Sequence, residues 1–349
     1  MKKDSKIYVA GHNGMVGSAI MRQLQAAGYS NIICKTSQEL DLRDQSQTFT
    51  FFAEHKPEYI FLAAAKVGGI IANNTYKADF IYDNTAIAMN VIRAAYEHNA
   101  NKLVNLGSSC IYPKFANQPI TEDSLLTGAL EPTNEAYAIA KITAVKLCRY
   151  FNEQYNTNYI SLMPTNLFGY MDNYNLETSH VLPALLRKML LAKALMSGDL
   201  DFIIDDLKKH ELGFGLDKKI KAGELSIKDA LASIGIYEDH IELWGTGKVL
   251  REFLFADDLS DAAIYFMNNV DAREAGEITN IGTGEDISIH DIANIIKNKT
   301  GYKGELKFDH SKPDGTPRKL LDVSKADALG WKFKTDIKTG IELVLKSLK

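Results

Sequence analysis

Close to its N-terminus the chain reads IYVAGHNGMVG, residues 7–17. The apolar residues 7–10 predict a buried strand, and residues 16–27 have the apolar spacing of a helix. Between them, glycines allow a sharp turn in which the backbone can approach a pyrophosphate closely. The start of the helix offers free N–H groups and the positive end of the helix dipole. The turn therefore predicts a dinucleotide-binding site. Its residues are Gly11, His12, Asn13, Gly14, Met15, Val16 and Gly17.

The first half of the chain continues this alternation of short apolar runs and longer helical patterns. Continuous apolar strands separated by helices are typical of a parallel sheet that is covered on both faces. We therefore expect an α/β fold, a Rossmann-type doubly wound parallel sheet. The expected strands are residues 7–10, 31–35, 59–63, 102–106 and 159–163, and the expected helices are residues 16–27, 45–54, 80–97 and 135–155.

After Pro164 the rhythm changes, which indicates a smaller C-terminal α/β substrate domain. We expect a dinucleotide-binding domain at residues 1–165, to which a segment near residues 251–275 returns, and a mainly substrate-binding domain at residues 166–349. Residues 197–239 form a helical insertion whose expected role is structural, with helices at 201–210 and 226–233. The other expected helices are residues 180–196, 257–269 and 288–300, and the other expected strands are residues 241–244, 251–255, 278–281 and 305–308.

The composition excludes several classes of protein. With 349 residues, 46% hydrophobic and 24% charged, the chain resembles an ordinary soluble globular protein. Its net charge of −4 does not suggest a nucleic-acid or membrane surface. No apolar run is long enough to span a membrane, and residues 1–7 do not resemble a signal peptide. The three cysteines fit no metal motif and favour a reducing compartment. We therefore expect a cytoplasmic protein without a metal site.

The second expected strand bears on which dinucleotide binds. NAD-specific sites place an acidic residue at the end of this strand, on the ribose 2′-hydroxyl. Here the strand ends in Cys34, Lys35, Thr36 and Ser37, and the first acidic residue is Glu39. A lysine favours the 2′-phosphate of NADP, so Lys35 favours NADP(H) over NAD(H). The alternative is that Lys35 is simply a solvated surface residue. Asp41 and Leu42 are expected near the adenine.

Three residues in the middle of the chain suggest a reductase. Tyr137 and Lys141 are four residues apart in an expected helix and so lie on one face of it. A phenol has a pKa of about 10, and we expect the neighbouring ammonium to lower it towards the working pH. On its own, such a pair is more typical of the surface of an amphipathic helix. However, Ser108 follows an expected strand upstream, where ligands bind in such sheets. The glycine turn, the serine and the Tyr–Lys pair in this order favour catalysis.

Longer segments extend this pattern. They are residues 10–19, 62–82 (LAAAKVGGIIANNTYKADFIY), 106–114 (LGSSCIYPK), 130–141 (LEPTNEAYAIAK), 163–168 (MPTNLF), 179–187 (SHVLPALLR) and 312–323 (KPDGTPRKLLDV). With them the chain resembles the extended short-chain dehydrogenase/reductase family, and within it the GDP-L-fucose synthases. The resemblance covers nearly the whole chain outside residues 197–239. It implies an NADP-dependent homodimer that epimerises GDP-4-keto-6-deoxy-D-mannose at C3 and C5 and then reduces its C4 ketone.

The resemblance also implies roles for single residues. Ser108, Tyr137 and Lys141 match its reduction triad, and Cys110 and His180 match its epimerisation acid/base pair. The positions that it assigns to the cofactor, besides the glycine turn, are Leu106, Gly107, Lys141, Pro164, Thr165, Asn166, Leu167 and His180. The positions that it assigns to the substrate are Lys188, Trp244, Arg251 and Asp314.

The chain departs from the family pattern at three of its positions. Close relatives carry basic residues where this chain has Asn13 and Ser37, which weakens the expected preference for NADP. Lys188 replaces an arginine and loses its bidentate geometry.

Other functions stay open at this stage. They are a reductase of another GDP-4-keto sugar such as a 6-deoxy-heptose, a non-catalytic NADP-binding regulator, and a nucleotide-sugar 4-epimerase or dehydratase. The Tyr–Lys pair counts against the regulator, and Cys110 counts against the dehydratase.

Overall fold

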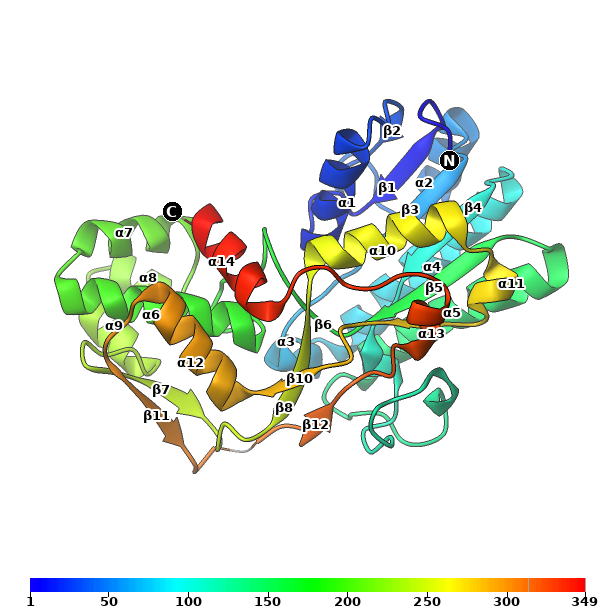
Figure 1. The fold of residues 1–349 in the computed structure, drawn as a ribbon. Coiled ribbons are helices and arrows are strands. Elements are labelled where there is room, and N and C mark those ends of the chain that lie inside the picture. The colour runs from blue at the N-terminus through cyan, green and yellow to red at the C-terminus, as the bar shows by residue number, and fades with distance from the viewer. Residues whose placement is uncertain (313, 349) are drawn as a thin grey trace.

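The computed structural model describes residues 1–312 and 314–348, apart from the side chains of Ile70 and Ile71. Its main sheet has six parallel strands in the order β2-β1-β3-β4-β5-β9 (Figure 1). This confirms the expected doubly wound parallel sheet. The strands are β1 (Ile7–Ala10), β2 (Ile32–Ile33), β3 (Tyr59–Leu62), β4 (Lys102–Leu106), β5 (Tyr159–Pro164) and β9 (Thr279–Ile281).

Helices cover both faces of this sheet because its strands are apolar on both sides. Ile7 and Val9 pack against α1 (Met15–Ala26) and α10 (Ala256–Asn269). Tyr8 and Ala10, which point the other way, share a core with the helices of the opposite face. Those helices are α2 (Gln45–His55), α4 (Lys77–Glu97) and α5 (Glu135–Tyr155). Both α10 and β9 come from the second half of the chain and join the first half here. Figure 1 shows α10 beside the strands of the first half.

A second body of structure packs around β8 (Leu250–Phe255), which pairs with three short strands. These are β6 (Asn166–Phe168), β10 (Asp286–Ser288) and β12 (Arg318–Lys319). A separate parallel pair joins β7 (His240–Trp244) to β11 (Glu305–Asp309). A single hydrophobic core links these strands to α6 (Val181–Ser197), α12 (Ile289–Thr300) and α14 (Ile337–Ser347).

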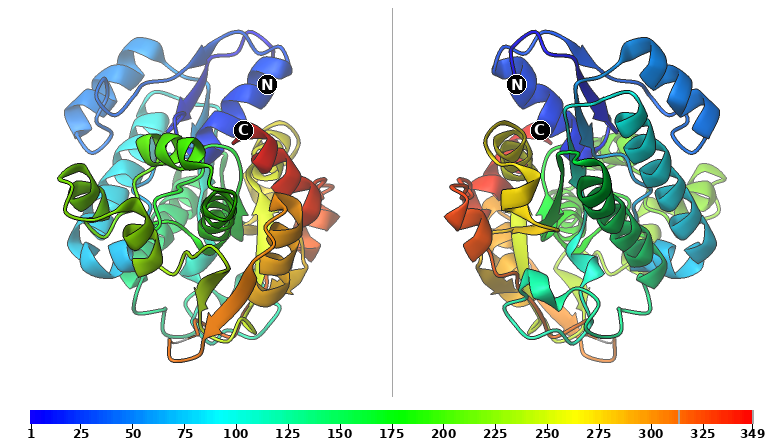
Figure 2. Two further views of the ribbon diagram at one scale, coloured as in Figure 1. Left: turned by 90° about the vertical axis from the view of Figure 1, so that its left-hand side faces the viewer. Right: turned by 90° about the vertical axis from the view of Figure 1, so that its right-hand side faces the viewer.

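The insertion is helical, as expected, and lies at the end of the molecule farthest from β4 and α11 (Figures 1 and 2). It contains α7 (Leu200–Lys209), α8 (Leu216–Lys221) and α9 (Ile227–Ser233), of which α8 was not predicted. The fully buried Arg187 of α6 fastens it. Its guanidinium bonds the Asp206 carboxylate at 2.9 and 2.7 Å and donates to three backbone carbonyls.

Several elements escaped prediction. Strands of two or three residues carry no period that a sequence pattern can show, and the strand expected at 31–35 is only two residues long. The unpredicted elements are β6, β10, β12, α8, α14, α3 (Ile70–Thr75), α11 (Ala272–Ala275) and α13 (Ser324–Ala328), with the 3₁₀ turns η1 (Ser109–Ile111) and η2 (Glu122–Ser124). None of the described helices is both long and apolar enough to cross a membrane.

Candidate active site

The glycine turn has the geometry of an anion cradle. Gly11 has φ +84°, a left-handed conformation that favours glycine, and a Cβ on Gly17 would lie 2.1 Å from the Gly11 carbonyl oxygen. Gly14 is the N-cap of α1 and, having no side chain, leaves the first N–H groups of the helix free. The Nδ1 atom of His12 is buried without a hydrogen-bond partner among the described residues. These features fit a pyrophosphate at the start of α1.

The loop that follows β2 carries the residues expected at the adenosine end of the cofactor. The Lys35 ammonium lies 3.5 Å from the Glu39 carboxylate. That carboxylate also accepts bonds from the backbone N–H and the hydroxyl of Thr36, each at 2.8 Å. The cation expected for a 2′-phosphate is therefore already paired with an acid. The sequence pattern placed the two residues in this loop but could not show their pairing.

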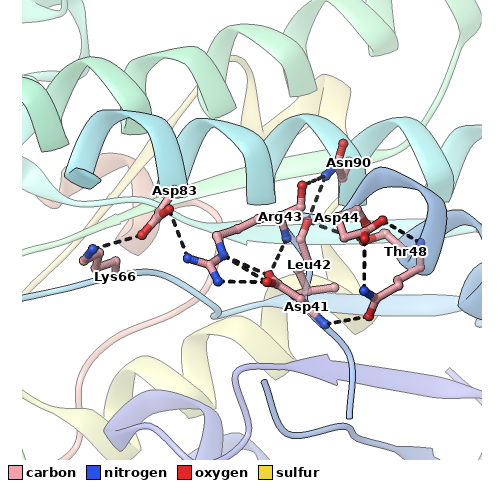
Figure 3. A network of polar contacts seen from close by, with 9 residues as sticks. Asp41, Leu42, Arg43, Asp44, Thr48, Lys66, Asp83 and Asn90 are labelled. Carbon is pink, nitrogen blue, oxygen red and sulfur yellow. Dashed lines mark hydrogen bonds and ion pairs between the residues drawn. The ribbon is translucent and has the colours of Figure 1, made fainter. Parts of the chain in front are cut away.

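A charged network continues from this loop to α4 (Figure 3). Arg43 binds both oxygens of Asp41 at 2.8–3.2 Å and lowers the pKa of that carboxyl. Arg43 also reaches Asp83 of α4 at 3.3 Å, and Lys66 reaches the same carboxylate at 3.0 Å. The side chain of Leu42 is buried in the core against α2 and α4, so what it offers a cofactor here is backbone.

The serine and the cysteine lie together at the carboxyl end of β4. Gly107 donates to the Leu162 carbonyl at 2.8 Å, and the side chain of Leu106 is buried. The Ser108 hydroxyl caps the turn η1 by accepting the N–H of Cys110 at 3.3 Å. Burial raises the pKa of the Cys110 thiol, and the nearby charge of Lys319 opposes that effect.

Tyr137 and Lys141 share one face of α5, as predicted, but their electrostatics differ from expectation. The Lys141 ammonium donates to the Leu106 carbonyl at 2.8 Å and lies 5.7 Å from the centre of the Tyr137 ring. Burial lowers the pKa of Lys141 to about 8. The expectation that Lys141 lowers the pKa of Tyr137 is wrong here, since burial raises that pKa and Cys110 adds to the effect.

His180 is the N-cap residue of α6. A hydrogen bond of 2.9 Å from the Gly69 N–H to the Thr178 carbonyl ties its loop to the segment after β3. His180 is exposed as a whole residue, yet the protein around its imidazole desolvates the ring and lowers its pKa, and the charge of Lys319 lowers it further. Lys319 is thus a shared neighbour of Cys110 and His180.

Pro164 ends β5, and the residues after it join the two bodies of the molecule. Thr165 donates its N–H to Ile281 of β9 at 3.0 Å. The Asn166 amide donates to the Glu252 carbonyl of β8 at 2.8 Å, and Leu167 pairs with Leu254 of the same strand. The segment therefore lies where the parallel sheet meets the strands around β8.

Three of the four expected substrate residues lie near one another, at the ends of β7 and β8. Trp244 is 65% exposed, and the Lys312 ammonium lies 5.6 Å from its ring. The Asp314 carboxylate accepts the N–H of Thr246 at 2.9 Å and its hydroxyl at 2.7 Å, which fixes the turn after Trp244. One guanidinium nitrogen of Arg251 donates hydrogen bonds to the carbonyls of both Leu250 and Thr316. The charge of Arg251 also interacts with that of Asp314.

Lys188 has a different setting from the other three. Its ammonium donates to the backbone carbonyls of Ile234 at 2.7 Å and Glu242 at 3.2 Å, and burial lowers its pKa to about 8. Two of its three N–H groups are therefore spent on the junction between the insertion and β7. This leaves little donor capacity for a substrate.

The sequence pattern missed two polar residues of this site. Lys319 of β12 lies beside Arg251 of β8 in register, and its ammonium has no hydrogen-bond or ion-pair partner in the described part of the chain. The Asn134 side-chain oxygen, one turn before Tyr137, is buried and equally unpartnered among those residues. Both belong to segments quoted above for the resemblance, but neither motif gave them a role of their own.

A family model and known proteins match most of this chain. The family model described as the NAD dependent epimerase/dehydratase family matches residues 7–206 and 219–282. The chain is 47% identical to GDP-L-fucose synthase 1 of Arabidopsis thaliana, over 97% of this chain and 91% of that one.

Two solved structures from Campylobacter jejuni are also similar, and each comparison covers 99% of this chain and at least 98% of the other. One is a GDP-6-OMe-4-keto-L-xylo-heptose reductase, 43% identical with a TM-score of 0.90. The other is MlghC, a GDP-mannoheptose C4 reductase with NADP bound, 42% identical with a TM-score of 0.86. These similarities confirm the family resemblance, and the chain belongs to the NAD dependent epimerase/dehydratase family.

Proposed function

We propose that the chain converts GDP-4-keto-6-deoxy-D-mannose to GDP-L-fucose with NADPH, by epimerisation at C3 and C5 followed by reduction of the C4 ketone. The observation that carries the proposal is the position of Cys110, two residues from Ser108 in the turn that also receives the Tyr137 face of α5. A reductase without epimerisation needs no proton-exchanging thiol there. The name of the Arabidopsis relative supports the same reaction.

The cofactor part of the proposal rests on the glycine cradle. Its N–H groups and the buried, unpartnered His12 nitrogen suit the pyrophosphate of NADP(H). Lys35 suits a 2′-phosphate once Glu39 releases it. The segment Pro164 to Leu167 suits the nicotinamide side. When bound, NADPH supplies the hydride that C4 accepts.

The reduction then needs a proton for O4. Because burial raises the pKa of Tyr137, its phenol holds its proton at neutral pH and is able to donate it. Ser108 offers a second hydroxyl to the same oxygen. Lys141, whose pKa of about 8 lies near neutrality, is suited to return a proton to the phenol afterwards.

The epimerisations use protons that the ketone acidifies. Removal of the C3 or C5 proton places charge on O4, which Ser108 and Tyr137 can stabilise as hydrogen-bond donors. Inversion then requires one group that takes a proton and another that returns one on the opposite face of the ring. The pKa of Cys110 is raised and that of His180 is lowered, so the resting pair is a thiol and a neutral imidazole. The thiol of Cys110 can therefore give a proton, and the neutral imidazole of His180 can accept one.

The GDP part of the substrate is assigned to the residues around β7 and β8. Trp244 offers an exposed aromatic face for the base or the sugar. Arg251 and Lys319 are neighbouring cations suited to the diphosphate. Asp314 keeps the turn after Trp244 in place. We assign Lys188 to stabilising the junction between the insertion and β7, and not to binding the phosphates.

A second candidate is a GDP-4-keto-heptose, because both solved heptose reductases cover 99% of this chain. The two candidates are separated by NADPH oxidation with GDP-4-keto-6-deoxy-D-mannose and with a GDP-4-keto-6-deoxy-heptose, followed by NMR of each product. We expect GDP-4-keto-6-deoxy-D-mannose to be used with the higher kcat/KM and to yield GDP-L-fucose. A heptose preference of tenfold or more would favour the second candidate.

We also infer a cytoplasmic homodimer. Within each copy, we assign cofactor binding to residues 1–165 and 251–275, and substrate binding mainly to residues 166–349.

The dimer contact is inferred from exposed apolar side chains. They form one stripe on α4, with Tyr82 and Met89 seven residues apart, and another on α5, with Ile139 and Tyr150. These adjacent helices are suited to a four-helix contact between two copies. Analytical ultracentrifugation should give a dimer that Tyr82→Glu weakens. A wild-type monomer at micromolar concentration would contradict this.

A further inference from the structure

Glu252 of β8 is a fully buried carboxylate with backbone partners from two separate segments. One of its oxygens accepts the N–H groups of Thr283 at 2.6 Å and Gly284 at 2.9 Å. Its other oxygen accepts the N–H of Leu321 at 2.9 Å. A buried charge is costly unless such donors compensate it, so the carboxylate fixes these three backbone groups relative to one another.

The same residue also lies between the cofactor side and the substrate side of the candidate site. Its backbone carbonyl accepts the Asn166 amide at 2.8 Å, within the segment assigned to the nicotinamide side. Its neighbour in β8 is Arg251, which is paired in register with Lys319 of β12. Leu321, held by the carboxylate, comes two residues after Lys319. Glu252 therefore bonds the side chain of Asn166 and the backbone of Leu321, and it is the chain neighbour of Arg251.

Strand β12 depends on such contacts because it is only two residues long. The Lys319 ammonium has no partner of its own among the described residues, so the backbone of β12 determines where it lies. On one side, the side-chain oxygen of Gln118 accepts the N–H of Leu320 at 2.8 Å, and the N–H of Ile120 donates to the Leu320 carbonyl, also at 2.8 Å. On the other side, Glu252 holds Leu321. Loss of either contact would let the strand shift relative to Arg251.

We propose that Glu252 is a positioning residue that sets the spacing of Arg251 and Lys319 for the diphosphate of the substrate. This rests on the proposed function, which assigns the two cations to that diphosphate. A diphosphate carries its charge on oxygens a few ångströms apart, so its affinity depends on the distance between the two cations. Glu252 does not itself meet the substrate. Its carboxylate acts through β12.

Glu252→Gln tests the proposal with little change in shape. A glutamine has one acceptor oxygen, which can keep Thr283 and Gly284, while its NH₂ group then faces the Leu321 N–H, donor against donor. Isothermal titration with GDP and, separately, with NADP⁺ is done on the wild type, on Glu252→Gln, on Lys319→Met and on the double variant. Glu252→Gln should weaken GDP binding about tenfold and leave NADP⁺ binding within twofold. When Glu252→Gln is added to Lys319→Met, it should weaken GDP binding by less than a further threefold.

Asp258 provides a matched control. It is also a buried carboxylate that accepts backbone N–H groups, from Lys334 at 3.2 Å and Thr335 at 2.8 Å, but it holds the C-terminal segment instead of β12. Asp258→Asn should lower the melting temperature to a similar degree without weakening GDP binding. Equal weakening of GDP binding by Asp258→Asn would mean that any loss of stability has this effect, and it would overturn the proposal.

Other results have equally definite meanings. A Glu252→Gln protein that binds GDP within twofold of the wild type, or a loss that is the same with and without Lys319, overturns the role of Glu252 alone. A wild-type protein that does not bind GDP contradicts the proposed function itself. If Glu252→Gln does not fold, hydrogen exchange on the wild type decides. GDP should slow exchange of the Leu321 amide and leave that of Thr335 unchanged, and an unchanged Leu321 amide would overturn the proposal.

Discussion

Replacing Lys141 with methionine should remove reductase activity without destabilising the protein at neutral pH. Burial lowers the pKa of this lysine from 10.5 to about 8. At about 1.4 kcal/mol per pKa unit, the charged ammonium costs the folded state about 3 kcal/mol. Methionine avoids that cost but loses the charged hydrogen bond to the Leu106 carbonyl, worth about 1.5–3 kcal/mol. Lys141→Met should therefore be as stable as the wild type at pH 7, or slightly more stable.

The difference in stability between the wild type and Lys141→Met should depend on pH. Below pH 8 the lysine is protonated in both the folded and the unfolded state, so the cost is constant. Between about pH 8 and pH 10.5 the unfolded state binds more protons than the folded state, and the wild type gains stability as the pH rises. Between pH 7 and pH 9.5 this gain amounts to about 2 kcal/mol. Lys141→Met lacks it.

The assay is urea unfolding of both proteins at intervals from pH 7 to pH 9.5, with NADPH oxidation measured alongside. The difference in the free energy of unfolding, variant minus wild type, should fall by about 2 kcal/mol over this range. Lys77, an exposed lysine of α4, serves as the control, and Lys77→Met should give a difference that does not vary with pH. A constant difference for Lys141→Met as well would contradict the lowered pKa of Lys141.

Three further predictions concern the cofactor cradle, the insertion and the proton donor. Gly17→Ala should lower stability by about 1–3 kcal/mol in thermal melts without cofactor, because its Cβ would lie 2.1 Å from the Gly11 carbonyl oxygen. Gly14→Ala should stay within about 0.5 kcal/mol in the same melts, because its Cβ would lie 3.5 Å from that oxygen, an ordinary contact distance. Arg187→Met should cost about 3–5 kcal/mol in urea unfolding because it leaves Asp206 and three carbonyls unpaired, and a loss below 1 kcal/mol would contradict this role. Tyr137→Phe should slow NADPH oxidation by roughly 10²–10⁴-fold with unchanged NADP⁺ affinity, and oxidation at more than a tenth of the wild-type rate would exclude the phenol as the donor.

The sequence was a good guide where the signal is local. The apolar run at residues 7–10 and the glycines after it predicted the first strand, the turn and the helix, since strand and helix periods are short-range properties. The pairing of Tyr137 with Lys141 on one face of a helix followed from their spacing in the same way. The family resemblance then assigned Cys110 and His180, which no spacing rule connects.

The remaining features depend on contacts between distant parts of the chain. The pKa of Tyr137 is set by burial, which a helical spacing does not reveal, and the expected direction was wrong for that reason. Lys188 is occupied by the carbonyls of Ile234 and Glu242, and only the folded insertion brings these together. Glu252 looks like any acidic residue in a strand until the fold places Leu321 beside it.

The proposed function requires that one active site performs both epimerisations and the reduction. The most direct test is incubation with GDP-4-keto-6-deoxy-D-mannose and NADPH in deuterated water, followed by NMR of the product. We expect one mole of NADPH to be oxidised per mole of GDP-L-fucose formed, with deuterium at both C3 and C5. A reduced product that keeps its original hydrogens and configuration at these carbons would contradict it.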